Sequence, residues 1–98
     1  MSTFNMAIYT PVGEIFNAPV ESLDAPGRDG RFGVLPHHAP MIIALRRGVL
    51  KATSEGQSAF FVTGEGVLEI SDGNVTVLAD TAIAAEDRYK AETLLATS

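Results

Sequence analysis

Apolar and polar residues alternate with a period of two along most of the chain up to about residue 80. That period places apolar side chains on one face of an extended segment, so it predicts β-strands. Gly, Pro, Asp and Asn interrupt the alternation, and the Gly-rich stretch APGRDGRFG (25–33) predicts a long loop. The expected strands are FNMAIY (4–9), GEIFNA (13–18), PVESLD (19–24), MIIAL (41–45), GVLKAT (48–53), SAFFVT (58–63), GVLEI (66–70) and NVTVLA (74–79).

Two of the joins between these strands have the sequence of a tight hairpin turn. SEGQ (54–57) and SDGN (71–74) each place Gly after an acidic residue, and Gly and Asp tolerate the positive φ that a primed two-residue turn requires. Short strands linked in this way predict a mainly β fold, a small two-sheet β-sandwich or flattened barrel of about eight to ten strands. The side chains expected to be buried in it are Phe4, Ile8, Phe16, Leu50, Phe60, Val62, Leu68 and Val77.

The last stretch, TAIAAEDRYKAETLLATS (81–98), is rich in Ala, contains no Gly or Pro, and predicts one helix. We therefore expect a β-sandwich domain over residues 1–81 and a C-terminal α-helix over residues 82–98, without a complete helical hairpin. This helix would lie on the sandwich or on a partner through a thin apolar stripe. The stripe would consist of Ala84, Ala91, Leu95 and the stem of Arg88.

Composition limits the possible classes of protein. The chain has 98 residues, enough for one domain, and its 46% hydrophobic and 19% charged content is typical of a globular protein. The absence of cysteine excludes disulfides and thiolate metal sites. The start, MSTFNMAIYT, lacks a basic region followed by an apolar one, and the longest apolar run, APMIIAL (39–45), is too short to span a bilayer. We therefore expect a soluble, cytoplasmic protein.

Charge is distributed unevenly along the chain. The net charge of −5 argues against a nucleic-acid partner, since binding phosphates requires a clustered cationic surface. Residues 28–51 nevertheless have a net charge of +4, which leaves −9 for the rest of the chain. This basic segment is either a solvated edge or a docking edge for an acidic or polar partner. Its charged residues are Arg28, Asp29, Arg31, Arg46, Arg47 and Lys51.

No group of residues has the pattern of a catalytic or cofactor site. The chain lacks the G-x-S-x-G motif of a nucleophile elbow, and GRDGRFG (27–33) is not followed by the Lys-Ser/Thr of a phosphate-binding loop. His37 and His38 are neighbours in an extended segment, so their side chains point to opposite faces and would not chelate one ion. We therefore expect a noncatalytic binding module without a cofactor or a metal.

Three stretches resemble one known family. DGRFGVLPHHAPMIIALRRGVL (29–50) is similar to the signature loop and following strands of the epsilon subunit of the rotary, proton-driven ATP synthase. VLEISDGNVTVLADTA (67–82) resembles the second signature of that family, and MAIYTPVGEIFNAPVESLDAPG (6–27) resembles its first hairpin. The resemblance spans nearly the whole chain and implies an N-terminal β-sandwich that sits on the rotor.

The resemblance implies a mechanical function. In that family the sandwich clamps the foot of the gamma subunit to the membrane-embedded ring of c subunits. This chain would then be a noncatalytic central-stalk subunit that couples proton translocation to ATP synthesis. It would reach the α and β subunits, and the cytoplasmic face of a bacterial-type cell membrane, only through the complex. The implied gamma contacts are His38, Ala39, Pro40, Met41 and Ile43, and the implied c-ring contacts are Arg28, Asp29, Gly30 and Arg31.

Three positions depart from the family pattern. His37 stands where the family usually has glycine, which predicts a positive φ with modest local strain. Glu65 replaces the first glycine of a Gly-Gly pair, so the sequence leaves undecided the backbone geometry at the start of the strand expected over residues 66–70. Arg31 occupies a place that is often acidic or variable in relatives. Met41 and Ile43 would serve equally well as sandwich core, because alternate apolar residues in a strand usually do.

The C-terminus departs most from the family. Complete relatives continue into an antiparallel helical hairpin that can inhibit ATP hydrolysis, and some carry an ATP-binding motif there. In this chain Arg88, Tyr89 and Glu92 stand where that motif has an apolar residue, Asp and Arg, so ATP binding is not expected. The chain is either a naturally short form or a truncated one, and we expect little inhibitory activity from it.

Two other function classes stay open at this point. A lipoyl- or biotinyl-type carrier domain is also small and rich in β-structure, but it requires a modifiable lysine at a hairpin tip. The Asp72–Gly73 turn has no lysine, and Lys51 lies within a predicted strand. The other class is a small metal-binding β-barrel protein, which would contain stoichiometric zinc, iron or copper.

Overall fold

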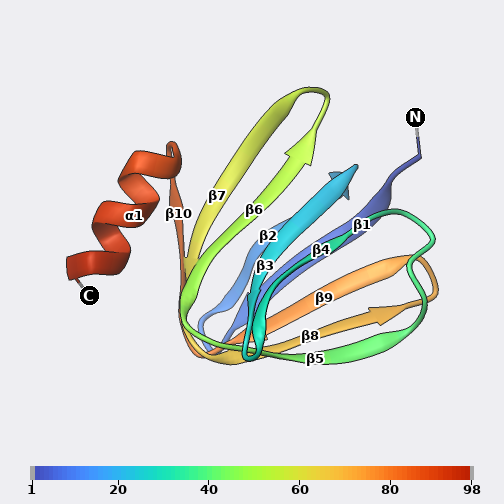
Figure 1. The fold of residues 1–98 in the computed structure, drawn as a ribbon, viewed down its shortest axis with the longest axis horizontal. Coiled ribbons are helices and arrows are strands. Elements are labelled where there is room, and N and C mark those ends of the chain that lie inside the picture. Colours follow the sequence, from blue (N-terminus) through green and yellow to red (C-terminus); the bar gives the residue numbers. More distant parts are fainter. Residues whose placement is uncertain (1, 98) are drawn as a thin grey trace.

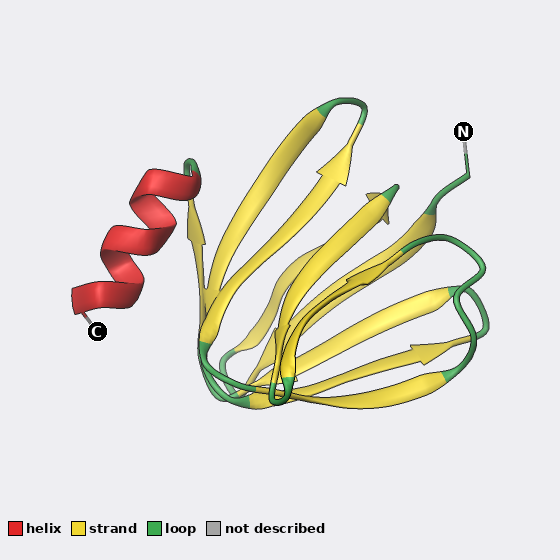
Figure 2. Ribbon diagram, viewed as in Figure 1, coloured by secondary structure: helices red, strands yellow, loops and turns green. Residues whose placement is uncertain are grey.

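The computed structural model describes residues 2–97, which form ten strands followed by one helix (Figures 1 and 2). The predicted fold class, a small β-sandwich or flattened barrel with a C-terminal helix, is confirmed. The elements are β1 (Phe4–Thr10), β2 (Gly13–Val20), β3 (Ser22–Gly27), β4 (Gly30–Val34), β5 (Met41–Leu45), β6 (Gly48–Ser54), β7 (Gln57–Thr63), β8 (Gly66–Ser71), β9 (Asn74–Ala79), β10 (Ala82–Ala85) and α1 (Arg88–Thr97).

The strands form one continuous sheet that folds over on itself. Its order is β10-β7-β6-β3-β5-β8-β9-β1-β2, with β4 paired to β3. Neighbouring strands are antiparallel except β1 and β9, which are parallel. The sheet folds at the β3–β5 join, where the ladder consists of the single pair Gly27 and Leu45. Contacts of β2 with β6 and β10 bring the two ends together, so the sandwich is nearly closed (Figure 1).

The interior is filled by apolar side chains from both halves of this sheet. Half-buried Phe16 packs against the core in an edge-to-face pair with buried Phe61, and the two ring centroids lie 5.0 Å apart. Burial is confirmed for most of the predicted core, but Phe60 and Phe16 are only half-buried. Phe61, not Phe60, is the ring of β7 that enters the main core. The predicted residues found buried are Phe4, Ile8, Leu50, Val62, Leu68 and Val77.

Both predicted hairpin turns are present. Ser54 pairs with Gln57 and Ser71 pairs with Asn74, so each turn has two residues at its tip. The tips are Glu55–Gly56 and Asp72–Gly73, and all four residues have positive φ, between 51° and 77°. Positive φ at both central residues is characteristic of a type I′ turn, whose twist matches that of the flanking strands.

The loop predicted over residues 25–33 is wrong, because this stretch forms the β3–β4 hairpin. Pro26 has no N–H, but it faces Arg31 as a non-hydrogen-bonded pair of the antiparallel ladder, so no N–H is required there. The carbonyl of Pro26 instead accepts a 3.0 Å hydrogen bond from Arg46 N.

The strand predicted over residues 19–24 is also wrong, because the chain leaves β2 at Val20 and begins β3 at Ser22.

The C-terminal helix begins later than predicted. Residues 82–85 form β10, which pairs with β7, and Ala84 therefore lies on a strand and not on the helix. Asp87 ends this extended segment by capping the helix, since its Oδ1 accepts a 2.8 Å hydrogen bond from Lys90 N. The helix α1 packs on the outer face of β6 and β7 through a second small cluster. That cluster consists of Val49, Val62 and Ala91, with Phe60, Ala85, Leu94 and Leu95 around them.

Candidate docking site

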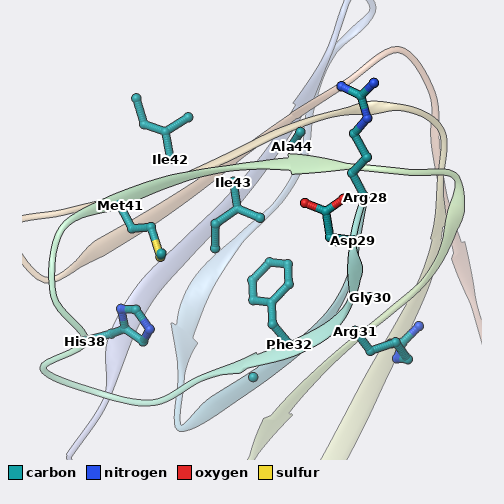
Figure 3. Close-up of a pocket in the computed structure, with 12 residues that line it drawn as sticks. Arg28, Asp29, Gly30, Arg31, Phe32, His38, Met41, Ile42, Ile43 and Ala44 are labelled. Atoms are coloured by element: carbon teal, nitrogen blue, oxygen red, sulfur yellow. The ribbon is translucent and has the colours of Figure 1, made fainter.

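A groove of about 790 Å³ lies between β4 and β5 (Figure 3). The β3–β4 turn lies at one end of the groove, and the loop that joins β4 to β5 contributes His38. The side chains of Phe32, Met41 and Ile43 turn toward the open space, and Phe32 and Ile43 are half-buried where they meet the core. The groove therefore has an apolar floor with polar groups at its ends.

This groove brings together two sets of residues that the sequence assigned to different partners. His38, Met41 and Ile43 come from the predicted gamma-contact set, while Arg28, Asp29, Gly30 and Arg31 come from the predicted ring-contact set. Ala39 and Pro40 are exposed in the adjoining loop and do not line the groove. The two predicted contact sets are thus parts of one continuous surface.

Arg31 is held by neighbouring residues of its own chain. Its guanidinium forms a 3.2 Å ion pair with Asp24, and Nη2 donates a 2.7 Å hydrogen bond to the carbonyl oxygen of Val49 on β6. In Figure 3 its side chain points away from the groove. Arg28 is exposed, and its side chain makes no hydrogen bond or ion pair with any other described residue, so it is the better candidate for a cation that meets a partner.

An exposed apolar strip lies beside the groove, and sequence reasoning missed it. On β5 the side chain of Ile42 is 71% exposed, whereas Ile43 is half-buried. Ala44, Val67 and Leu78 are also exposed, and ladder pairing aligns them across β5, β8 and β9. We call Ile42, Ala44, Val67 and Leu78 the outer apolar strip. Exposed apolar surface gathered in this way is typical of a protein interface.

The described residues offer no alternative centre of chemistry. Residues 2–97 contain no group of three or more His, Asp or Glu side chains placed to hold a metal ion. Neither the Glu55–Gly56 tip nor the Asp72–Gly73 tip carries a lysine, and Lys51 lies inside β6. Within the same residues no helix has the length and apolarity needed to cross a membrane.

Comparison with known proteins gives this surface its context. The family model for the β-sandwich domain of the ATP synthase delta/epsilon chain matches residues 3–85. The chain belongs to this family. The resemblance seen in the sequence is therefore confirmed.

Similar epsilon chains come from several bacteria. The ATP synthase epsilon chain of Pelotomaculum thermopropionicum is 41% identical over 85 residues, which are 87% of this chain and 63% of that one. The epsilon chain of Desulfitobacterium hafniense is 39% identical over 80 residues, or 82% of this chain and 61% of that one. The chain thus spans less than two thirds of the length of these relatives.

Two solved structures share the fold. A chain in the OSCP/F1/c-ring structure of the Euglena gracilis mitochondrial ATP synthase matches with a TM-score of 0.80 at 21% identity, covering 96% of this chain and 62% of that one. A chain in the central stalk/c-ring structure of the Tetrahymena thermophila enzyme matches with a TM-score of 0.70 at 15% identity, covering 81% and 64%. At these identities the matches establish the fold.

Two departures from the pattern of this family can now be placed. His37 has φ 68°, as predicted from the glycine it replaces, and the loop contains a bond from His38 N to the carbonyl oxygen of Leu35. Glu65 is exposed, does not have a positive φ, and accepts a 3.0 Å bond from Asp80 N at its carbonyl. A Cβ at the following Gly66 would lie 2.0 Å from the carbonyl oxygen of Leu78. The second glycine of the pair is therefore required by packing, and the first is not.

Proposed function

We propose that this chain is a noncatalytic central-stalk subunit of a proton-translocating ATP synthase, linking the gamma subunit to the c ring. The observation that supports this most directly is the continuous surface formed by the groove and the outer apolar strip, in a chain of the delta/epsilon family. The chain would couple proton translocation to ATP synthesis by transmitting torque. It would lie at the cytoplasmic face of the cell membrane through the complex, and would reach the α and β subunits in the same way.

The gamma subunit would dock on the outer apolar strip and on the adjoining loop. Exposed Ile42 and Leu78 give this surface the apolar centre that protein interfaces usually have. The predicted contacts His38, Ala39, Pro40 and Met41 continue it along the loop and the start of β5. Ile43 would support the interface from below, because it packs against the core.

The c ring would dock at the tip of the β3–β4 hairpin. Arg28, Asp29 and Gly30 are exposed there, and Arg28 is free to meet a polar loop. Arg31 would act mainly by fixing β4 to β3 through Asp24 and to β6 through the carbonyl of Val49. A hairpin held in this way transmits force from its tip to the sandwich.

Little inhibition of ATP hydrolysis is expected from α1. The apolar side of this helix is occupied by β6 and β7. Arg88, which stands in the place of an apolar residue of the family's ATP motif, lies over the Phe60 ring at 5.3 Å from its centroid. A helix held in this way is unsuited to reach the catalytic subunits or to hold ATP.

A pull-down from the native cell tests this function. The tagged chain should recover gamma and, with it, the α and β subunits, and an Ile42→Glu variant should recover much less. The matched control is Ile83→Glu, which changes an equally apolar side chain, 52% exposed, on β10. Recovery of none of these subunits by the unmodified chain would overturn the proposal.

A further inference from the structure

The groove between β4 and β5 is bordered by two strand edges that have no ladder partner among the described residues. β4 pairs only with β3, and β5 pairs with β8 on one side and with β3 at Leu45 alone on the other. An unpaired edge presents a row of N–H and C=O groups that can bond to an added strand. The groove therefore offers backbone groups as well as side chains.

The pairing pattern shows which backbone groups face the groove from β4. Pro26 lacks an N–H, and its carbonyl bonds to Arg46 on the side away from β4. Two residues directly opposite each other in an antiparallel ladder direct their N–H and C=O groups either both toward the partner strand or both away from it. Pro26 points away from β4, so its partner Arg31 points away from β3. Gly33, two residues on, does the same, and both residues line the groove.

Alternate residues of β5 also direct their backbone groups toward the groove. The carbonyl of Ala44 accepts a 2.9 Å bond from Arg28 N, which shows that Ala44 directs its backbone groups away from β8. Ile42 has the same orientation because the period of a strand is two. The N–H and C=O of Ile42 and the N–H of Ala44 therefore face the groove from the other wall, and both residues line it.

Gly33 supplies an independent sign that another backbone approaches here. Its φ is not positive, the β3–β4 ladder has no bulge, and a Cβ would meet nothing closer than the carbonyl oxygen of Leu23 at 3.8 Å. The eight other glycines either have positive φ or leave less than 3.0 Å for a Cβ. When the fold itself does not require a glycine inside a strand, that glycine often marks the close approach of a second backbone.

We propose that the groove binds an extended segment of the gamma subunit, with alternate apolar side chains, as an added β-strand on the free edge of β4. This inference rests on the proposed function and adds the mode of docking and the chemistry of the segment. These apolar side chains would face Phe32 and Met41 on the groove floor. The groove continues the surface of His38 and Met41 on which gamma would dock, so a segment of gamma is the occupant within reach of the β4 edge.

Residue-resolved amide hydrogen exchange of the full chain, alone and with purified gamma subunit, tests this mode. The amides of Arg31 and Gly33 should exchange at least tenfold more slowly in the complex. The amide of Phe32, which faces β3, is the internal control and should be slow in both states. Gly33→Val should weaken gamma binding at least tenfold, whereas Ala84→Val, a similar change at an exposed position of β10, should leave it unchanged.

The outcomes separate this inference from the proposed function. If gamma binds while Arg31 and Gly33 keep their exchange rates, strand addition is wrong and the proposed function stands. If gamma does not bind at all, the proposed function fails and this inference fails with it. If protection of these amides appears without gamma and rises with chain concentration, the occupant is a second copy and the proposal is overturned.

Discussion

Arg31 on β4 donates a 2.7 Å hydrogen bond from Nη2 to the carbonyl oxygen of Val49 on β6, while the same guanidinium pairs with Asp24 on β3. One side chain thus connects three strands near the tip of the hairpin. Arg28, three residues away on the turn, makes no such contact with another residue in the described part of the chain. Two arginines that look alike in the sequence therefore differ in what they do.

Reversal of charge should distinguish these two arginines. Arg31→Glu removes the bond to Val49 and places a carboxylate beside Asp24, so it should lower the free energy of unfolding by about 1–2 kcal/mol. Arg28→Glu should change it by less than about 0.5 kcal/mol. Urea denaturation of both variants measures the difference. Equal losses would show that the contacts of Arg31 do not support the hairpin.

Truncation of neighbouring aromatic residues on β7 should give unequal losses. Phe61→Ala empties the space beside Phe16 in the main core and should cost about 3–5 kcal/mol. Phe60→Ala, at a half-buried ring under Arg88, should cost about 1–2 kcal/mol. Thermal and urea unfolding would measure both. A larger loss for Phe60 would place the main core on the opposite face of β7.

The hydroxyl of Thr63 is fully buried and has no hydrogen-bond partner among the described residues. Thr63→Val should therefore raise the free energy of unfolding by about 1 kcal/mol, since it removes a desolvated polar group at nearly constant volume. Thr53→Val is the control, because the Thr53 hydroxyl already contacts Ser58 at 3.3 Å and no gain is expected. A loss of stability in the Thr63 variant would mean that its hydroxyl has a partner.

His37 holds a left-handed backbone, with φ 68°, in the loop beside the groove. His37→Gly should raise the free energy of unfolding by up to about 1 kcal/mol, because glycine adopts this φ without steric cost. His37→Val should lower it by at least about 1 kcal/mol, because a β-branched residue is strained there. Chemical denaturation of the pair tests the assignment. Equal stabilities of the two variants would contradict the positive φ.

The strands and tight turns could be predicted because their signals are local. The alternation of residues 74–79 and the Asp72–Gly73 turn each specify a conformation within a few residues. The β3–β4 hairpin was missed because Gly27 and Gly30 resemble loop residues until their pairing is known. Likewise, Ala-rich composition concealed β10, which exists only because β7 supplies its ladder partner.

The candidate site was predicted in part. Seven residues named from the sequence as candidate contacts line the groove, but their meeting on one surface depends on the fold: Arg28, Asp29, Gly30, Arg31, His38, Met41 and Ile43. The sequence did not distinguish exposed Ile42 from half-buried Ile43, and its choice of Phe60 over Phe61 for the core was wrong, because each pair lies in an uninterrupted apolar run. Such a run carries no alternation, so the face of each residue cannot be read from it.

The central claim is that the outer apolar strip and groove dock this chain on the rotor. ATP-driven proton pumping in membrane vesicles, measured beside ATP hydrolysis with the unmodified chain, Ile42→Glu or Ile83→Glu in the complex, tests it most directly. The account predicts that Ile42→Glu abolishes pumping and weakens gamma binding at least tenfold, with the thermal midpoint unchanged, while Ile83→Glu behaves as the unmodified chain. Unchanged pumping and binding with Ile42→Glu would contradict it.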